Sequence, residues 1–129
     1  MINYELMAET IQDQANFNGR VAIVLGSGLG PFADNLQDQT IIPYDTILGY
    51  PKSTVEGHSG ELVIGSFNEI ELIAAKGRFH YYEGYEFDEI TIPIHVFSKL
   101  GVDHLIITNS SGSMDINALP GTLMAITGH

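Results

Sequence analysis

The chain has 129 residues and a formal net charge of −11, from 16 acidic residues against 5 lysines and arginines. Nucleic-acid binding needs clustered cations, so this balance argues against it, and any anion site must be built locally from backbone amides and a few basic groups. The absence of cysteine excludes disulfides and thiolate metal sites. A hydrophobic fraction of 44% suffices for one domain over residues 1–129, and with neither a visible secretory signal nor a bilayer-spanning run we expect a cytoplasmic protein.

The first part of the chain predicts a helix, a buried strand and a glycine-rich loop. Residues 4–16 show a loosely helical rhythm of apolar positions. Residues 21–25 form a continuous apolar run, which is typical of a strand buried on both faces. The loop Gly26-Ser27-Gly28-Leu29-Gly30 follows, and Pro31 is suited to the first position of a short helix.

The rest of the chain predicts further strands and one longer helix. Apolar residues recur at helical spacing over 88–100, and Gly101 is a suitable C-cap. Pro93 fits this helix only near its first turn, because proline lacks the amide hydrogen. Strands are predicted over residues 61–67, 70–76, 104–108 and 122–127, the first two joined as a hairpin and the third of the buried type.

These elements together predict an α/β fold. Strands alternate with helices, and loops rich in glycine and serine follow the strands. This order favours a mixed, mostly parallel central sheet with flanking helices. Ligands of such sheets bind where the strands end in loops, so these loops are the candidate functional segments.

The loop at residues 26–30 is a candidate anion site. Closely spaced glycines after a strand can turn their amides toward an anion, and Ser27 adds a hydroxyl donor. The spacing fits neither the dinucleotide fingerprint nor the phosphate-binding P-loop, since no Gly-Lys-Ser or Gly-Lys-Thr is present. Taken alone, the loop fits a plain tight turn better than a binding site.

The segment after the strand 70–76 carries a stronger signal. If the chain stays extended, Arg78 and His80 point to one side and Phe79 packs on the other, because strand side chains alternate. An arginine fork beside a titratable histidine makes a compact clamp for an anion. Glu83 could hold His80 in one tautomer. A surface ion pair between Arg78 and Glu83 explains the pattern about as well.

Other polar segments carry weaker signals. The loop at residues 109–113 again places small residues after a strand, where backbone amides are available to an anion or polar ligand. His58 stands in a Gly-His-Ser-Gly turn, where a lone histidine is usually just exposed to solvent. Tyr82 belongs to a run of tyrosines that either covers the core or packs on a sugar. No pair of histidines or carboxylates has convincing metal-ligand spacing.

Four segments together resemble the trimeric purine nucleoside phosphorylase family. They occur in the family's order and at similar spacing, and the resemblance extends over nearly the whole chain from about Val21 onward. The segments are Gly26-Ser27-Gly28-Leu29-Gly30, Gly57-His58-Ser59-Gly60, Gly77-Arg78-Phe79-His80-Tyr81-Tyr82-Glu83-Gly84-Tyr85 and Thr108-Asn109-Ser110-Ser111-Gly112.

The resemblance implies roles for seven residues. Tyr82 looks like the family's ribose-contacting tyrosine, and Glu83 like the acid that supports His80 in catalysis. The positions that look like the phosphate-binding set are Ser27, His58, Arg78, His80 and Ser110, the last through its backbone amide. The implied fold is that of the nucleoside phosphorylases.

The resemblance also implies an activity. Family enzymes are transferases that cleave the N-glycosidic bond of purine (deoxy)ribonucleosides with orthophosphate, giving free base and ribose 1-phosphate. They act in purine salvage, need no cofactor besides this co-substrate, and assemble as homo-oligomers, typically trimers. The family's purine-reading residues would lie beyond residue 129, so we expect a truncated, N-terminal portion of the fold.

Two departures from the family's pattern leave a second interpretation open. Ser110 and Ser111 stand where the family commonly has alanine, and Ser113 where it has glycine. The second and larger departure is length, because the family's purine-reading residues would lie beyond residue 129. The alternative to an active phosphorylase is therefore a catalytically inactive module that binds phosphate alone. Dinucleotide binding is the weakest interpretation, because the glycine spacing is wrong.

Overall fold

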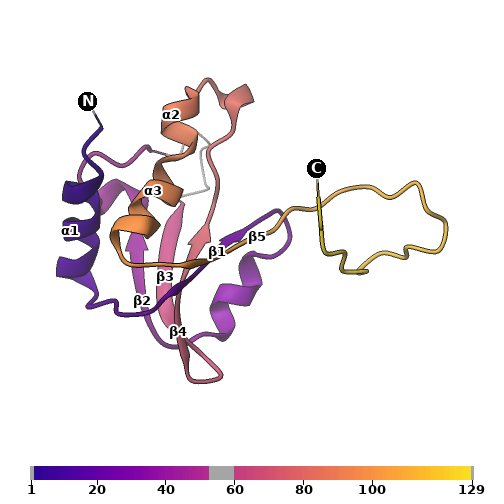
Figure 1. The fold of residues 1–129 in the computed structure, drawn as a ribbon, viewed down its shortest axis with the longest axis horizontal. Coiled ribbons are helices and arrows are strands. Elements are labelled where there is room, and N and C mark those ends of the chain that lie inside the picture. Colours follow the sequence, from indigo (N-terminus) through magenta and orange to yellow (C-terminus); the bar gives the residue numbers. More distant parts are fainter. Residues whose placement is uncertain (1, 53–59, 129) are drawn as a thin grey trace.

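The computed structural model describes residues 2–52 and 60–128 and shows a five-stranded mixed sheet flanked by helices (Figure 1). The strand order is β2-β3-β4-β1-β5. The strands are β1 (Val21–Leu25), β2 (Gln37–Pro43), β3 (Glu61–Phe67), β4 (Ile70–Lys76) and β5 (His104–Ile107). The α-helices are α1 (Tyr4–Gln14), α2 (Phe87–Ile90) and α3 (Ile92–Lys99). The short 3₁₀ helices are η1 (Gly30–Asn35), η2 (Tyr44–Thr46) and η3 (Tyr81–Glu83).

The pairing of the strands confirms the predicted mixed sheet. β1 lies parallel to both β4 and β5, with Val21 opposite Leu72 on one side and His104 on the other. β3 runs antiparallel to both β2 and β4. The predicted hairpin is present, and its two turn residues, Asn68 and Glu69, have φ angles of 49° and 66°.

 Positive φ at both positions matches the twist of the flanking strands, which explains the tight connection.

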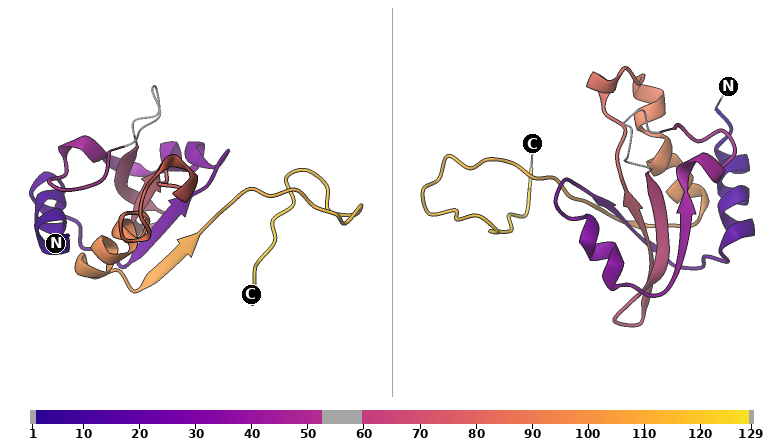
Figure 2. Two further views of the ribbon diagram at one scale, coloured as in Figure 1. Left: turned by 90° about the horizontal axis from the view of Figure 1, so that it is seen from above. Right: turned by 180° about the vertical axis from the view of Figure 1, so that it is seen from behind.

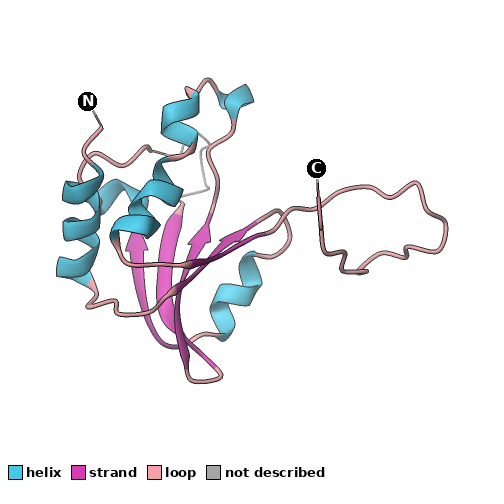
Figure 3. Cartoon of the chain, in the orientation of Figure 1, coloured by secondary structure: helices cyan, strands magenta, loops and turns pink. Residues whose placement is uncertain are grey.

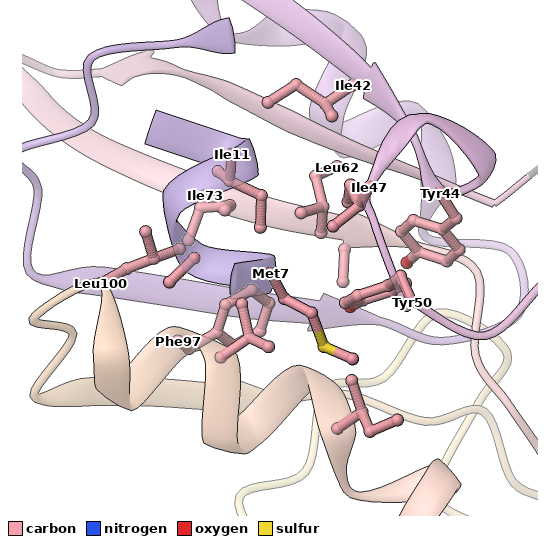
Figure 4. Close-up of a cluster of buried hydrophobic side chains, with 14 of the residues drawn as sticks. Met7, Ile11, Ile42, Tyr44, Ile47, Tyr50, Leu62, Ile73, Phe97 and Leu100 are labelled. Atoms are coloured by element: carbon pink, nitrogen blue, oxygen red, sulfur yellow. The ribbon is translucent and has the colours of Figure 1, made fainter. Parts of the chain in front are cut away.

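Helices flank the sheet (Figure 3), and its inner strands β3 and β4 bury side chains on both faces because successive side chains alternate. On one face, Leu62 and Ile73 pack against α1 and α3, in a core whose helical residues include Met7, Ile11 and Phe97 (Figure 4). Their strand neighbours point to the opposite face. There Val63, Leu72 and Ala74 form a smaller core with Ala33 and Leu36 from η1 and its C-terminal end.

The predicted helix over 88–100 is present as two helices that meet at Thr91. The amide of Thr91 still bonds to the carbonyl oxygen of Phe87, at 3.2 Å. α3 then begins at Ile92 and has Pro93 in its first turn, where the missing amide hydrogen breaks no helical bond. Gly101 follows the last turn with a φ of 86°, as expected for a glycine at a helix end.

The sequence analysis missed β2, the strand at one edge of the sheet. Most of its residues are exposed, and Ile42 is its one buried hydrophobic residue. The register shifts between Gln37 and Thr40, where Asp38 has a φ of 51°. An exposed edge strand with a bulge has no regular alternation of apolar and polar residues, so its pattern could not reveal it.

Two predictions for the end of the chain were wrong. β5 forms as predicted but is not buried, since Leu105, Ile106 and Ile107 are 39%, 50% and 61% exposed. No strand forms over residues 122–127, and the segment after β5 extends away from the sheet (Figure 2). Among the described strands, none pairs with the outer edge of β5. The apolar residues 122–127 do not reach this edge, and a segment without a hydrogen-bonded neighbour does not form a strand.

Among the described residues, no helix is both long enough and apolar enough to cross a bilayer.

Candidate functional site

A cleft of about 840 Å³ lies where the three parallel strands β1, β4 and β5 end. Carboxyl ends of parallel strands meet at one edge of a sheet, which is the usual position for a ligand. The cleft gathers six of the residues predicted from the sequence, namely Ser27, Arg78, His80, Tyr82, Glu83 and Ser110. The seventh, His58, lies outside the described residues.

The glycine loop after β1 forms one wall of the cleft. The amide of Leu29 bonds to the carbonyl oxygen of Gly26 at 3.1 Å, which closes a turn. Gly28 has a φ of 82°, a conformation that glycine adopts without steric cost. Ser27 is exposed and lines the cleft, so its hydroxyl is accessible to a ligand.

Thr108 joins this loop to the one that follows β5. Its hydroxyl donates to the carbonyl oxygen of Val24 at 2.9 Å and accepts from the amide of Gly26, also at 2.9 Å. Gly26 has no room for a side chain, because a Cβ there would lie 2.7 Å from the carbonyl oxygen of Thr108 and 2.8 Å from Cα of Asn109. The two loops are therefore in direct contact, and Ser110 stands just beyond it.

Arg78 supplies the strongest signal for a ligand. It follows Gly77, whose φ of 115° turns the chain as it leaves β4. Nε and Nη2 of Arg78 are buried and have no hydrogen-bond partner among the described residues. Burial lowers the pKa of this guanidinium. Buried donors without partners are costly, so an arginine in this state is suited to bind an anion.

The Glu83 carboxylate binds the backbone amide of His80 and not its imidazole ring. Oε2 of Glu83 accepts a hydrogen bond from the amide of His80 at 2.9 Å, which holds the turn of η3. The His80 ring instead stacks on Tyr82, with ring centroids 4.8 Å apart and planes 11° apart. No ion pair joins Arg78 to Glu83 in the described part of the chain. The surface-pair interpretation of this segment therefore has no support.

The predicted alternation across residues 78–80 is present. Arg78 and His80 both line the cleft, whereas Phe79 is 5% exposed. The Phe79 ring packs in the core against Tyr44 and Tyr85, with centroid separations of 5.4 and 5.2 Å. The buried ring anchors the segment, so its two polar neighbours are held toward the cleft.

Lys76 is a cleft residue that the sequence analysis missed. Its Nζ lies 2.9 Å from Oε1 of Glu61 and 3.1 Å from Oδ1 of Asp34. These hydrogen bonds, that of Glu61 first, raise the pKa of Lys76. The same period of two that grouped Arg78 with His80 would have identified it, since Lys76 stands two positions earlier.

Tyr44 was also missed, and no local signal could have identified it. It lies in η2, 34 positions before Arg78, and lines the cleft. Its hydroxyl donates to the carbonyl oxygen of Gly77 at 2.9 Å.

Within the described ranges no group of three histidine, aspartate or glutamate residues is placed to hold a metal ion.

Comparison with known proteins identifies relatives over nearly the whole chain. Purine nucleoside phosphorylase 1 of Geobacillus stearothermophilus is 42% identical over 125 residues, and the match covers 97% of this chain and 46% of that protein. The purine nucleoside phosphorylase of Mus musculus is 39% identical, with 98% and 44% covered. The chain thus spans less than half the length of these curated relatives.

Solved structures agree with the sequence comparison. A purine nucleoside phosphorylase in complex with ribose-1-phosphate matches with a TM-score of 0.85 and 37% identity, over 91% of this chain and 43% of that one. Isoform 2 of the Schistosoma mansoni enzyme, in complex with cytosine and ribose-1-phosphate, matches with a TM-score of 0.82 and 40% identity, over 88% and 40%. The sequence model of the phosphorylase superfamily matches residues 20–129. The chain therefore belongs to the phosphorylase superfamily and corresponds to the N-terminal part of a purine nucleoside phosphorylase.

Proposed function

We propose that the chain provides the phosphate-binding half of a purine-nucleoside phosphorylase. The observation that carries this proposal is Arg78, which lines the cleft together with the glycine loop and has two buried donors without a partner among the described residues. An anion bound there would satisfy both donors in surroundings with little competing water. The two relatives solved with ribose-1-phosphate support phosphate as the anion.

The proposed reaction is phosphorolysis of a purine (deoxy)ribonucleoside. An oxygen of orthophosphate forms a bond to C1′ of the sugar, while the bond from C1′ to the base nitrogen breaks. The electron pair stays with the base, which takes up a proton, and ribose 1-phosphate is the second product. Phosphate held beneath the sugar both acts as the nucleophile and stabilises the positive charge that develops there. No cofactor is needed beyond this co-substrate.

The proposed residue roles are supported by the cleft lining and by the family resemblance. Arg78 provides the fixed charge, Ser27 a hydroxyl, and the loop at Ser110 a backbone amide, while His80 donates from its ring. His58 lies outside the described residues and is assigned to the set from the family resemblance alone. Tyr82, which stacks on His80 and is 83% exposed, offers a face on which the sugar can lie. Glu83 holds the backbone of His80 in place.

The alternative is an inactive module that binds phosphate and nothing more. It is favoured by one observation, that the chain spans less than half the length of its curated relatives. The two functions share the phosphate site and differ only in turnover. Cleavage of inosine by the purified chain, dependent on orthophosphate and followed as hypoxanthine release, would support the phosphorylase; phosphate binding without cleavage would support the module.

Phosphate binding is tested with the two arginines of the chain. Arg78→Ala should abolish the heat of binding of inorganic phosphate in calorimetry. Arg20→Ala is the matched control, because Arg20 is exposed and pairs with Asp103 outside the cleft. Equal binding by wild type and Arg78→Ala would refute the proposed site.

Three further points belong to the same proposal. Residues 1–129 form one domain, the chain assembles into homo-oligomers as its family does, and the protein works in the cytoplasm in purine salvage. The exposed hydrophobic residues of β5 support association. Size-exclusion chromatography with light scattering, and fractionation of cells that express the chain, test the second and third points.

A further inference from the structure

Tyr44 is a buried residue that reaches the cleft from a part of the sequence without any motif. It stands in η2, directly after the edge strand β2, and is 2% exposed. Its ring packs against Tyr50 and Phe79, with centroids 4.9 and 5.4 Å away. Figure 4 shows Tyr44 and Tyr50 side by side at one end of the main core.

The hydroxyl of Tyr44 holds the point where the chain leaves β4. It donates a hydrogen bond of 2.9 Å to the carbonyl oxygen of Gly77. Gly77 has a φ of 115°, so the chain turns sharply there, one residue before Arg78. The strand ladder ends at Lys76, which pairs with Glu61, and therefore gives Gly77 no further support.

The backbone and ring of Tyr44 contact the same place from the β3 side. The amide of Tyr44 donates to the carbonyl oxygen of Gly60 at 3.0 Å. A Cβ on Gly60 would lie only 2.2 Å from Cε2 of Tyr44, and a Cβ on Gly77 only 3.1 Å from Cα of Gly60. Tyr44 thus contacts both glycines at the open end of the β3–β4 pair, and its ring leaves Gly60 no room for a side chain.

Arg78 depends on this support because no side chain among the described residues holds its guanidinium. Nε and Nη2 lack partners there, and Nη2 lies against Gly26, within 3.1 Å of the place where a Cβ would stand. Its direction is therefore set by the backbone from which it emerges. Small errors in the position of a binding group cost much of its effect.

We propose that Tyr44 is a positioning residue, whose hydroxyl fixes the Gly77 carbonyl and thereby aims Arg78 at the bound anion. This inference rests on the proposed phosphate site. Tyr44 touches no reacting atom, and its contribution passes through Gly77.

The test compares Tyr44→Phe with Tyr50→Phe in the 129-residue chain. Both changes remove one buried hydroxyl from the same aromatic cluster, but the Tyr50 hydroxyl has no partner among the described residues. Tyr44→Phe should weaken binding of inorganic phosphate about fivefold to tenfold, the effect of one hydrogen bond, as measured by calorimetry. Tyr50→Phe should stay within about twofold of wild type. Circular dichroism confirms that both variants fold.

Hydrogen exchange without phosphate gives a readout that does not need the ligand. Amides of residues 78–80 should exchange several-fold faster in Tyr44→Phe than in wild type or Tyr50→Phe, because the turn at Gly77 opens more often. If wild type bound no phosphate, the proposed function would fail while exchange still decided the role of Tyr44. Unchanged exchange, equal effects of the two variants, or faster exchange with undiminished phosphate affinity would each overturn the positioning role.

Discussion

The hydroxyl of Thr108 accepts a hydrogen bond from the amide of Gly26 at 2.9 Å, although 82 positions separate the two residues. The same hydroxyl donates to the carbonyl oxygen of Val24, so one side chain ties the end of β1 to the start of the loop after β5. Both loops line the cleft. The Thr108 side chain therefore adds to the pairing of β1 with β5 in fixing the relative position of the two loops.

Replacing Thr108 by valine should loosen this connection. Valine keeps the shape but leaves the amide of Gly26 without a partner, which costs about 1–3 kcal/mol of unfolding free energy. Urea unfolding measures this loss, and calorimetry should show weaker phosphate binding. Thr108→Ser retains the hydroxyl and should recover most of both; a serine variant as impaired as the valine variant would contradict the explanation.

Gly26→Ala should damage the site through crowding. The new methyl group would meet the carbonyl oxygen of Thr108, Cα of Asn109 and Nη2 of Arg78 at 2.7, 2.8 and 3.1 Å. Backbone atoms cannot yield cheaply, so we expect a loss of about 1–3 kcal/mol in unfolding free energy together with weakened phosphate binding.

The matched control for that change lies in the same loop. A Cβ on Gly30 would lie 3.7 Å from Cε of Lys76, an ordinary van der Waals contact. Gly30→Ala should therefore change the unfolding free energy by less than about 0.5 kcal/mol. If the two alanine variants had equal effects, crowding at Gly26 would not be the cause.

Lys76 should stabilise the fold in a way that alkaline pH removes. Hydrogen bonds to Glu61 and Asp34 raise its pKa in the folded chain above the ordinary 10.5. Its contribution is thus fully present below pH 10.5 and is lost as the pH rises through the folded-state pKa. Lys76→Met should lower the unfolding free energy by about 0.5–1 kcal/mol at neutral pH, and the difference from wild type should shrink above that value.

The comparison of wild type with Lys76→Met should be repeated in a second variant, because other groups also titrate at high pH. Burial raises the pKa of Tyr44 and of Tyr50, so both tyrosines also reduce stability at high pH, but equally in wild type and in Lys76→Met. In a Glu61→Gln chain, which lacks the main partner, the Lys76→Met change should cost less and depend less on pH. A cost that stays constant from neutral pH to above 10.5 would refute the ion-pair explanation.

The exposed strand β5 should make the 129-residue chain associate at high concentration. Ile107 is 61% exposed in β5, an edge strand whose outer side pairs with no other described strand, a combination that favours contact between copies. Ile107→Lys should lower the average mass measured by light scattering. Ile70→Lys is the control, because Ile70 is 54% exposed but lies in β4 beside the hairpin turn. A monodisperse monomer in the wild type would contradict the prediction.

Much of the site could be predicted because its signals are local. The alternation of residues 78–80 placed Arg78 and His80 on one side and Phe79 in the core, as the structure has them. Glycine loops after apolar runs predicted the walls of the cleft. What local pattern could not reveal was the partner of Glu83, which is the amide of His80, or the presence of Lys76 in an ion-pair network with two distant carboxylates.

By itself, the sequence determined the strand β1, the hairpin of β3 and β4, and the loops that follow the parallel strands, because periodicity and turn residues act over short distances. Only the tertiary structure decided that the polar segment at residues 37–43 pairs as an edge strand, that β5 is exposed, and that Tyr44 supports Gly77. Each of these features depends on contacts between segments that are distant in the sequence, and the local pattern of apolar and polar residues does not indicate such contacts.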